Sequence, residues 1–314
     1  MKPDVLIVAP MYPAAIEALD RAFATHKLWL ARERAALIGS VAERVRAIAT
    51  TAFPEGAVDA ALIGALPHLE IIASFGVGVD PIDLEAAKRR NIVVTNTPNV
   101  MNDCVADLAI GLIIAAARRL CQGERYVREG KWLTAPLPPA MKVSGKRLGI
   151  VGLGRIGRVI AKRAEGFDMR IAYHSRHPVP EVPFPHYGRL TELAAASDFL
   201  VVATPGGKDT FHLVDEAVMR ALGPQGILVN VARGSVVDER ALVQCLQEGA
   251  LGGAALDVFE NEPRVPEALM AMDNVVLEPH VGSGTHETRA AMGQLVVDNL
   301  IAHFAGKPPL TPVR

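Results

Sequence analysis

The sequence predicts an α/β protein built from two doubly wound parallel sheets. Short apolar runs typical of buried strands alternate along the chain with stretches of helical periodicity. This alternation favours parallel strands joined by crossover helices. A length of 314 residues suits two domains, each with a core of its own. The turn signal Thr97-Pro98-Asn99 separates two series of strands, and we expect the first hinge there.

The first series predicts the smaller, flavodoxin-like domain. Its expected strands cover residues 5–8, 47–49, 70–74 and 92–95, and its expected helices cover residues 14–24 and 81–90. The last helical pattern, over residues 285–305, has no further strand to join in the second series. We therefore expect this helix to return to the first domain. The prediction is a discontinuous domain of residues 1–98 and 286–314, with a second domain of residues 99–285.

The second series contains a glycine-rich motif between a strand and a helix. The expected strands cover residues 147–151, 170–173, 199–203, 227–230, 253–257 and 275–277. The motif Gly152-Leu153-Gly154-Arg155-Ile156-Gly157 follows the first of these strands and precedes a helical stretch over residues 158–164. In that setting the glycines permit a tight turn, bring bare backbone to a pyrophosphate and let the helix pack closely. We therefore predict a Rossmann dinucleotide-binding domain, with an ordinary strand-to-helix turn as the alternative. The predicted cofactor contacts in the motif are Gly152, Gly154, Arg155, Ile156 and Gly157.

Charge and cysteine content narrow the class of partner. Lys and Arg number 33 and Asp and Glu 34, so we expect a small-molecule ligand and neither nucleic acid nor a membrane surface. The cysteines Cys104, Cys121 and Cys245 form no CxxC pair, which argues against a disulfide framework or a metal site and favours buried bystanders. The start of the chain is typical of a strand and not of a secretory signal, and the apolar run 108–117 is too short to span a bilayer. We expect a cytoplasmic protein.

Further motifs, in order along the chain, carry a family resemblance. They are Ser74-Phe75-Gly76-Val77-Gly78-Val79-Asp80, Asn230-Val231-Ala232-Arg233-Gly234, Leu256-Asp257-Val258-Phe259-Glu260-Asn261-Glu262-Pro263 and Pro279-His280-Val281-Gly282. Together with the glycine motif they resemble the signatures of the D-isomer-specific 2-hydroxyacid dehydrogenases, over nearly the whole chain. Within this family the chain is most similar to glyoxylate/hydroxypyruvate reductases and plant-type hydroxyphenylpyruvate reductases, notably over residues 126–132 and 280–285. The resemblance implies NAD(P) binding by the second domain and substrate binding by the first.

Three polar residues supply what the reduction of a 2-oxo acid requires. The reaction needs a cation for the carboxylate, an acid for the ketone oxygen and a reason for that acid to stay protonated. The planar fork of Arg233 can pair with the carboxylate and polarise the ketone. His280 follows an expected strand, at the edge where parallel sheets bind ligands, and is the predicted proton donor. Glu262 is the predicted carboxylate that favours its protonated form. Each residue alone is more often structural, and it is their combination that favours catalysis.

Two loops are predicted to contact anions. The glycines of Gly76-Val77-Gly78 can aim backbone N–H groups at a substrate carboxylate, so we expect Val77 and Gly78 to bind substrate, with a simple tight turn as the alternative. After the strand at 170–173, an NAD enzyme usually has an acidic residue that binds the ribose. This chain has Ser175 and Arg176 there, which can bind a 2′-phosphate. We therefore predict that NADP(H) is preferred and that NAD(H) remains possible.

The remaining site residues rest on the resemblance. It implies that Asp257 holds the nicotinamide carboxamide, that Thr204, Val231 and Gly282 line the cofactor path together with His280, and that Ser283 contacts substrate. Trp132 lies in a segment that resembles the family's dimer arm, so it either reaches the partner subunit's pocket in a homodimer or packs as an ordinary apolar residue.

The predicted function is an NADPH-preferring reductase of short 2-oxo acids, glyoxylate and hydroxypyruvate, that forms D-2-hydroxy acids. The first alternative is an aryl-pyruvate reductase that acts on hydroxyphenylpyruvate. A second alternative, from another class, is a dinucleotide-sensing module like the corepressors that share this architecture. The presence of Arg233, Glu262 and His280 favours an enzyme over a sensing module.

Overall fold

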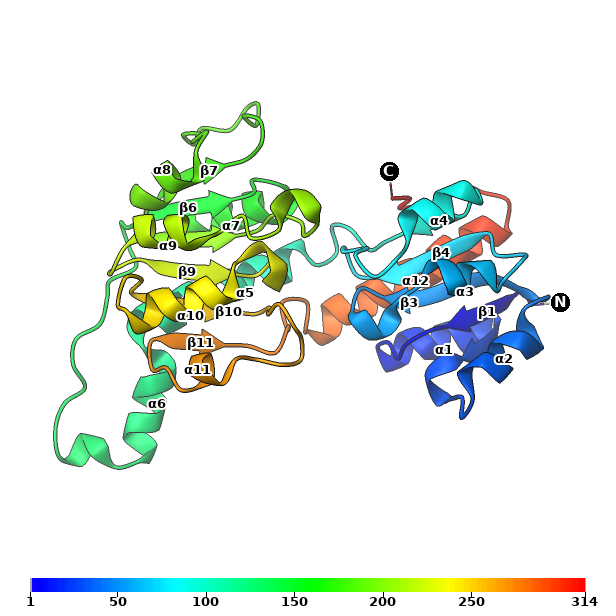
Figure 1. Ribbon diagram of the computed structural model, residues 1–314, viewed down its shortest axis with the longest axis horizontal. Coiled ribbons are helices and arrows are strands. Elements are labelled where there is room, and N and C mark those ends of the chain that lie inside the picture. Colours follow the sequence, from blue (N-terminus) through cyan, green and yellow to red (C-terminus); the bar gives the residue numbers. More distant parts are fainter. Residues whose placement is uncertain (1, 314) are drawn as a thin grey trace. The chain divides into compact units, whose positions relative to one another are not determined.

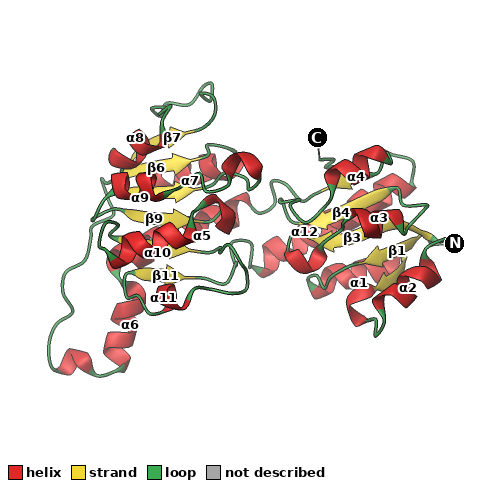
Figure 2. Cartoon of the chain, viewed as in Figure 1, coloured by secondary structure: helices red, strands yellow, loops and turns green. Residues whose placement is uncertain are grey.

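The computed structural model describes residues 2–313 and divides into two compact units. The first unit contains the residues up to Met101 and those from Thr285 onward, and the second contains Asn102–Gly284. Each unit has a sheet of its own with helices packed on it (Figures 1 and 2). The neighbouring strands of both sheets pair in parallel, as the sequence predicts for this fold class.

The first unit has the flavodoxin-like strand order. Its five strands lie in the order β2-β1-β3-β4-β5. The strands are β1 (Asp4–Ile7), β2 (Ala24–Lys27), β3 (Val45–Thr51), β4 (Ile71–Phe75) and β5 (Val93–Thr95). The helices are α1 (Pro13–Ala22), α2 (Arg34–Val41), α3 (Ala60–Gly64), α4 (Leu84–Arg89) and α12 (His286–Phe304). Helix α12 packs on α1 and β4, and Gly293 permits a close approach because a Cβ there would collide with Ala15.

The sequence analysis missed one strand of this unit. We expected a helix over residues 14–24, whereas α1 ends at Ala22 and β2 begins at Ala24. All four residues of β2, with the sequence ATHK, are half-buried. An edge strand of this kind shows neither a continuous apolar run nor an alternation of apolar and polar residues, so its sequence gives no clear strand signal.

The second unit has a six-stranded sheet in the order β11-β10-β9-β8-β6-β7. The strands are β6 (Arg147–Val151), β7 (Arg170–His174), β8 (Phe199–Val202), β9 (Ile227–Asn230), β10 (Gly253–Leu256) and β11 (Val275–Leu277). The helices are α5 (Asn102–Arg118), α6 (Leu120–Arg128), α7 (Arg155–Glu165), α8 (Leu190–Ala195), α9 (Glu216–Leu222), α10 (Glu239–Gln247) and α11 (Glu267–Met270). Every residue of β8, β9 and β10 is buried, which is why these strands are apolar without alternation.

The strand order of the second unit reverses at β6. Strand β7 pairs with one side of β6 and β8 pairs with the other. Beyond β7, an isolated parallel bridge joins Tyr173 to His186. In doubly wound sheets, ligands bind at the carboxyl ends of the strands, at the point where the order reverses. The segment that follows β6 is the glycine motif, so the topology places this motif at the expected ligand position.

Helix α6 differs from the other long helices of its unit because none of its residues is buried. It continues into a 3₁₀ helix at Lys131–Leu133, and Figure 1 shows this arm projecting from the second unit.

The expectation that all three cysteines are buried is wrong for Cys121, which lies on α6 and is exposed, whereas Cys245 is buried. Within residues 2–313, no helix is long and apolar enough to cross a membrane.

Candidate active site

The glycine motif has the geometry of a dinucleotide-binding turn. Gly152 has a φ of 95°, and a Cβ there would lie 2.9 Å from the backbone of Thr204. A Cβ on Gly157 would collide with the carbonyl oxygen of Gly152, so this glycine allows α7 to start close to β6. A Cβ on Gly154 would meet nothing within 4 Å.

Gly154 is also the N-cap of α7, and no side chain caps this helix. Its first N–H groups therefore donate no hydrogen bond to a side chain of the N-cap residue, and such a helix N-terminus suits a pyrophosphate. The side chain of Arg155 is exposed and that of Ile156 is half-buried. The turn thus fits the group that the sequence predicts.

Arg233 lies in a loop that is shaped by a buried asparagine. Asn230, the last residue of β9, is 1% exposed. Its side-chain amide donates to the carbonyl of Arg233 at 2.9 Å and its Oδ1 accepts from the N–H of Ala232 at 3.0 Å. Arg233 itself is half-buried, and its Nη1 donates to the carbonyl of Ala232 at 2.7 Å. The buried amide therefore fixes the backbone that carries the guanidinium.

The next residue brings this loop against the segment that carries Glu262. A Cβ on Gly234 would collide with the backbone of Phe259, so only glycine fits at this point. The N–H of Phe259 in turn donates to Oε1 of Glu262 at 3.0 Å. The loops after β9 and β10 are thus packed together.

His280 and Glu262 form the ion pair that the sequence predicts. Nδ1 of His280 lies 2.7 Å from Oε2 of Glu262, and the two side chains are 26% and 20% exposed. Because a carboxylate only accepts hydrogen bonds, Nδ1 carries the donated proton. Burial alone would raise the pKa of Glu262, but His280, the N–H of Phe259 and the charge of Arg233 together hold it below its ordinary value. The structure therefore brings Arg233, Glu262 and His280 together.

The turn after β11 is held by Asp257. His280 has a φ of 54°, a strained value for a residue other than glycine. Asp257, which is 2% exposed, accepts the N–H of Val281 at 2.6 Å and that of Gly282 at 2.8 Å. A Cβ on Gly282 would lie 2.9 Å from this carboxylate. Burial raises the pKa of Asp257, while these two N–H groups and His280 act in the opposite direction. Both carboxylate oxygens of Asp257 thus hold the turn that carries His280. The sequence analysis predicted only a contact of Asp257 with the nicotinamide carboxamide and did not foresee this structural role.

The loop after β7 carries the two predicted phosphate ligands, and of these only Ser175 donates its hydrogen bond within the loop. Arg176 is exposed, and its Nη1 lies 3.6 Å from the carboxylate of Asp209. The hydroxyl of Ser175 donates to the carbonyl of His177 at 2.6 Å. A hydroxyl has one proton to donate, so Ser175 must rotate before it can donate to a phosphate.

The other predicted residues are distributed over both units. Thr204 follows β8 and packs against Gly152, and Val231 follows β9 and is 8% exposed. Ser283 is half-buried beside Gly282. Val77 and Gly78 belong to the first unit and are half-buried.

The turn at Val77 is anchored by residues that follow β5. The side chain of Asn96 donates to the carbonyl of Val77 at 2.7 Å. The hydroxyl of Thr97 accepts from the N–H of Gly76 at 3.1 Å.

The sequence analysis did not single out Asn230 as a functional candidate. The sequence could have indicated Asn230, because it is a polar residue at the end of an otherwise apolar strand. Such a residue must be hydrogen-bonded when it is buried. Asn230 opens the motif that ends with Arg233 and Gly234, and its amide holds that loop.

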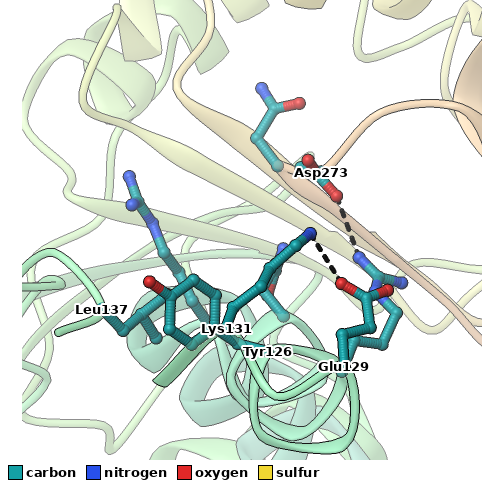
Figure 3. A pocket seen from close by; sticks show the side chains of 9 residues that line it. Tyr126, Glu129, Lys131, Leu137 and Asp273 are labelled. Atoms are coloured by element: carbon teal, nitrogen blue, oxygen red, sulfur yellow. Dashed lines mark hydrogen bonds and ion pairs between the residues drawn. The ribbon is translucent and has the colours of Figure 1, made fainter. Parts of the chain in front are cut away.

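A cavity of about 390 Å³ lies beside α6, in the second unit. Its lining includes Tyr126, Glu129, Lys131, Leu137 and Asp273 (Figure 3). Lys131 pairs with Glu129 at 2.6 Å, and Asp273 pairs with Arg125 at 2.9 Å. The three predicted catalytic residues are not among its lining residues. Trp132, next to Lys131 in the chain, is 68% exposed.

Comparison with known proteins places the chain in a family. The NAD-binding domain of the D-isomer-specific 2-hydroxyacid dehydrogenases matches residues 110–282. Glyoxylate/hydroxypyruvate reductase A of Arabidopsis thaliana is 52% identical, over 98% of this chain and 98% of that protein. The hydroxyphenylpyruvate reductase of Plectranthus scutellarioides is 50% identical over the same shares.

A solved structure is similar over the full chain. It is the NADPH-dependent glyoxylate/hydroxypyruvate reductase of Sinorhizobium meliloti in complex with NADP and malonate. The two chains are 43% identical with a TM-score of 0.92, and the match covers 100% of this chain and 97% of the other. These matches show that the chain belongs to the D-isomer-specific 2-hydroxyacid dehydrogenase family.

Proposed function

We propose that this protein is an NADPH-preferring reductase of glyoxylate and hydroxypyruvate, which forms the D-2-hydroxy acid where the product is chiral. The observation that carries the proposal is the 2.7 Å contact between His280 and Glu262, with the charge of Arg233 acting on the same carboxylate. Relatives named as reductases of these two substrates support the choice of substrate.

Arg233 has the role of the anion site in this mechanism. Its guanidinium pairs with the substrate carboxylate and polarises the adjacent ketone, which a planar, permanently charged fork does better than an ammonium group. Asn230 fixes the backbone of its loop through two hydrogen bonds, so the guanidinium starts from a defined position. Val77 and Gly78, in the first unit, are proposed to bind substrate through backbone N–H groups.

His280 protonates the ketone oxygen. Nδ1 donates to Glu262, so Nε2 is the nitrogen that gives its proton to the substrate. The carboxylate of Glu262 stabilises the imidazolium and fixes the ring, and its lowered pKa keeps it charged over the working range. Asp257 holds the backbone after His280, and Ser283 contacts the bound substrate.

The nicotinamide cofactor, when bound, supplies the hydride. The glycine turn and the N-terminus of α7 hold its pyrophosphate, and Thr204, Val231 and Gly282 line its path. Arg176 pairs with the 2′-phosphate, joined by Ser175 once its hydroxyl turns away from His177. No carboxylate at the end of β7 repels the phosphate, since this strand ends in His174.

A matrix of initial rates tests the reaction, the substrate size and the cofactor at once. The substrates are glyoxylate, hydroxypyruvate and hydroxyphenylpyruvate, each with NADPH and with NADH. We expect the two short acids and NADPH to give the highest kcat/KM. A preference for hydroxyphenylpyruvate, the substrate in the name of the relative from Plectranthus scutellarioides, would assign the chain to aryl-pyruvate reduction. Absence of turnover with all three acids would leave the dinucleotide-sensing alternative.

The protein is further proposed to be a homodimer assembled through the α6 arm. No residue of α6 is buried, Leu133 is 94% exposed and Trp132 is 68% exposed. A large aromatic residue beside an exposed leucine on a projecting arm favours a protein interface, in which Trp132 reaches the pocket of the second copy. Light scattering of wild type and of the double variant Trp132→Ala, Leu133→Ser tests this, and a variant of unchanged mass would contradict it.

We also propose that the protein acts in the cytoplasm. Cys121 and Cys245 form no disulfide, and Cys121 is exposed. Unpaired thiols are typical of a reducing compartment. Fractionation of the cells that make the protein tests this location, and recovery of the protein in a membrane or secreted fraction would contradict it.

A further inference from the structure

The loop after β8 carries a carboxylate that faces the predicted phosphate ligand. Nη1 of Arg176 lies 3.6 Å from Oδ2 of Asp209, and the two side chains are 85% and 81% exposed. Asp209 lies in a short 3₁₀ helix, Lys208–Thr210, that follows Gly207. Gly207 has a φ of 130°, so the backbone enters this helix through a conformation that favours glycine.

The strand order places this contact next to the dinucleotide-binding turn. Arg176 follows β7 and Asp209 follows β8, and β6 lies between these two strands in the sheet. The glycine turn at Gly152–Gly157 follows β6 at the same edge. The ion pair therefore joins the two loops on either side of the dinucleotide turn.

Arg176 is the principal cation that this loop offers to a phosphate, because the neighbouring polar groups already donate hydrogen bonds to backbone carbonyls. The hydroxyl of Ser175 donates to the carbonyl of His177. Nδ1 of His174 donates to the carbonyl of Tyr187 at 2.8 Å, and Nε2 of His186 donates to the carbonyl of Ser175 at 3.0 Å. These three donors are used within the loop, whereas the guanidinium of Arg176 has its charge partner in Asp209.

We propose that Asp209 is a specificity residue that competes with the 2′-phosphate of NADP(H) for the guanidinium of Arg176. The proposal rests on the proposed use of NADP(H). A phosphate carries more charge than a carboxylate and forms stronger charge-assisted hydrogen bonds, so it displaces Asp209 when it binds. NAD(H) has no 2′-phosphate and leaves the pair intact. Asp209 thus lowers the preference for NADP(H) and helps to keep NAD(H) acceptable.

The test is binding of two adenosine fragments to the full chain, measured by calorimetry. Adenosine 2′,5′-bisphosphate carries the discriminating phosphate, and adenosine 5′-phosphate lacks it. An exposed ion pair contributes little, so Asp209→Asn should tighten the bisphosphate about twofold to fivefold and leave the monophosphate unchanged. The same ratio should appear in kcat/KM for NADPH against NADH. Added salt should reduce the gain, because both side chains are exposed.

Two variants serve as controls. In an Arg176→Ala background, Asp209→Asn should no longer favour the bisphosphate, because the two ligands share one guanidinium. Glu248→Gln removes a carboxylate from another exposed pair, with Arg220 at 2.5 Å. Glu248 lies between the end of α10 and the start of β10, and therefore on the side of the sheet where the strands begin. The dinucleotide turn lies on the side where the strands end, so this change should leave both fragments unaffected.

The outcomes separate the inference from the proposed function. If Arg176→Ala weakens the bisphosphate selectively but Asp209→Asn changes neither fragment, the competition is refuted and the cofactor assignment stands. If Asp209→Asn tightens both fragments equally, the residue acts by general charge and the specificity role is refuted. If Arg176→Ala has no selective effect, the NADP(H) assignment itself fails.

Discussion

Replacement of Glu262 by Gln tests the carboxylate–imidazole pair without removing the hydrogen bond. The amide keeps the size of the side chain and an oxygen that can accept from Nδ1 of His280, but it has no charge. The variant removes the negative charge beside the proton donor, so the basic limb of the kcat profile should move to lower pH. The same contact acts on Glu262, because the hydrogen bond and the charge of His280 help to lower the pKa of this carboxyl against the effect of burial.

The expected size of the shift follows from the distance and the exposure of the pair. An opposite charge within a few ångströms moves a titration by about 1–3 pH units. At 2.7 Å the contact is close, but the side chains are 26% and 20% exposed and water screens part of the interaction. We therefore expect a shift of the basic limb to lower pH that is smaller than for a fully buried pair.

The assay is the steady-state rate of hydroxypyruvate reduction at saturating NADPH from pH 5 to pH 10, in wild type and Glu262→Gln. The matched control is Glu260→Gln, two residues away, whose carboxylate pairs with His212 at 2.5 Å and not with His280. The control should leave the basic limb in place. A Glu262→Gln profile that matches wild type in position and height would remove Glu262 from the mechanism.

Two further variants test the anion site. Arg233→Lys should lower kcat/KM for glyoxylate about 10- to 150-fold, which corresponds to about 1.5–3 kcal/mol for one lost charge-assisted hydrogen bond, and Arg233→Ala should lower it further. Full activity of the Lys variant in steady-state kinetics would show that the planar fork is not needed. Asn230→Ala should raise KM for the 2-oxo acid about tenfold or more while the Kd for NADPH stays nearly constant, because it leaves the N–H of Ala232 and the carbonyl of Arg233 without their partner. Equal weakening of substrate and cofactor in that variant would indicate general destabilisation instead.

The sequence predicted the elements whose pattern is dictated by burial. Strands β6, β9 and β11 have the bounds that the sequence predicts, because buried parallel strands tolerate few polar residues. Strand β2 was missed because an edge strand of half-buried residues shows no such run. The glycine motif was identifiable because Gly152 and Gly157 are required by backbone contacts that any side chain would block.

The pairing of the candidate site residues was predictable from the sequence, and their supporting contacts were less so. The pairing of His280 with Glu262 follows from chemical complementarity, although nothing in the sequence gives the left-handed backbone of His280. Asp257 was identified, but its two bonds to backbone N–H groups depend on how the turn after β11 folds back onto β10. The contact of Arg176 with Asp209 depends on strand order, which a single sequence leaves open.

The most direct test of the proposed reaction is the effect of His280→Ala on hydroxypyruvate reduction. The variant should lower kcat about a hundredfold or more, since it removes the proton donor. Its Kd for NADPH, measured by fluorescence titration, should stay close to the wild-type value, because the glycine turn and Arg176 remain. A variant that binds NADPH normally and turns over at nearly the wild-type rate would contradict the assignment of His280 as the acid.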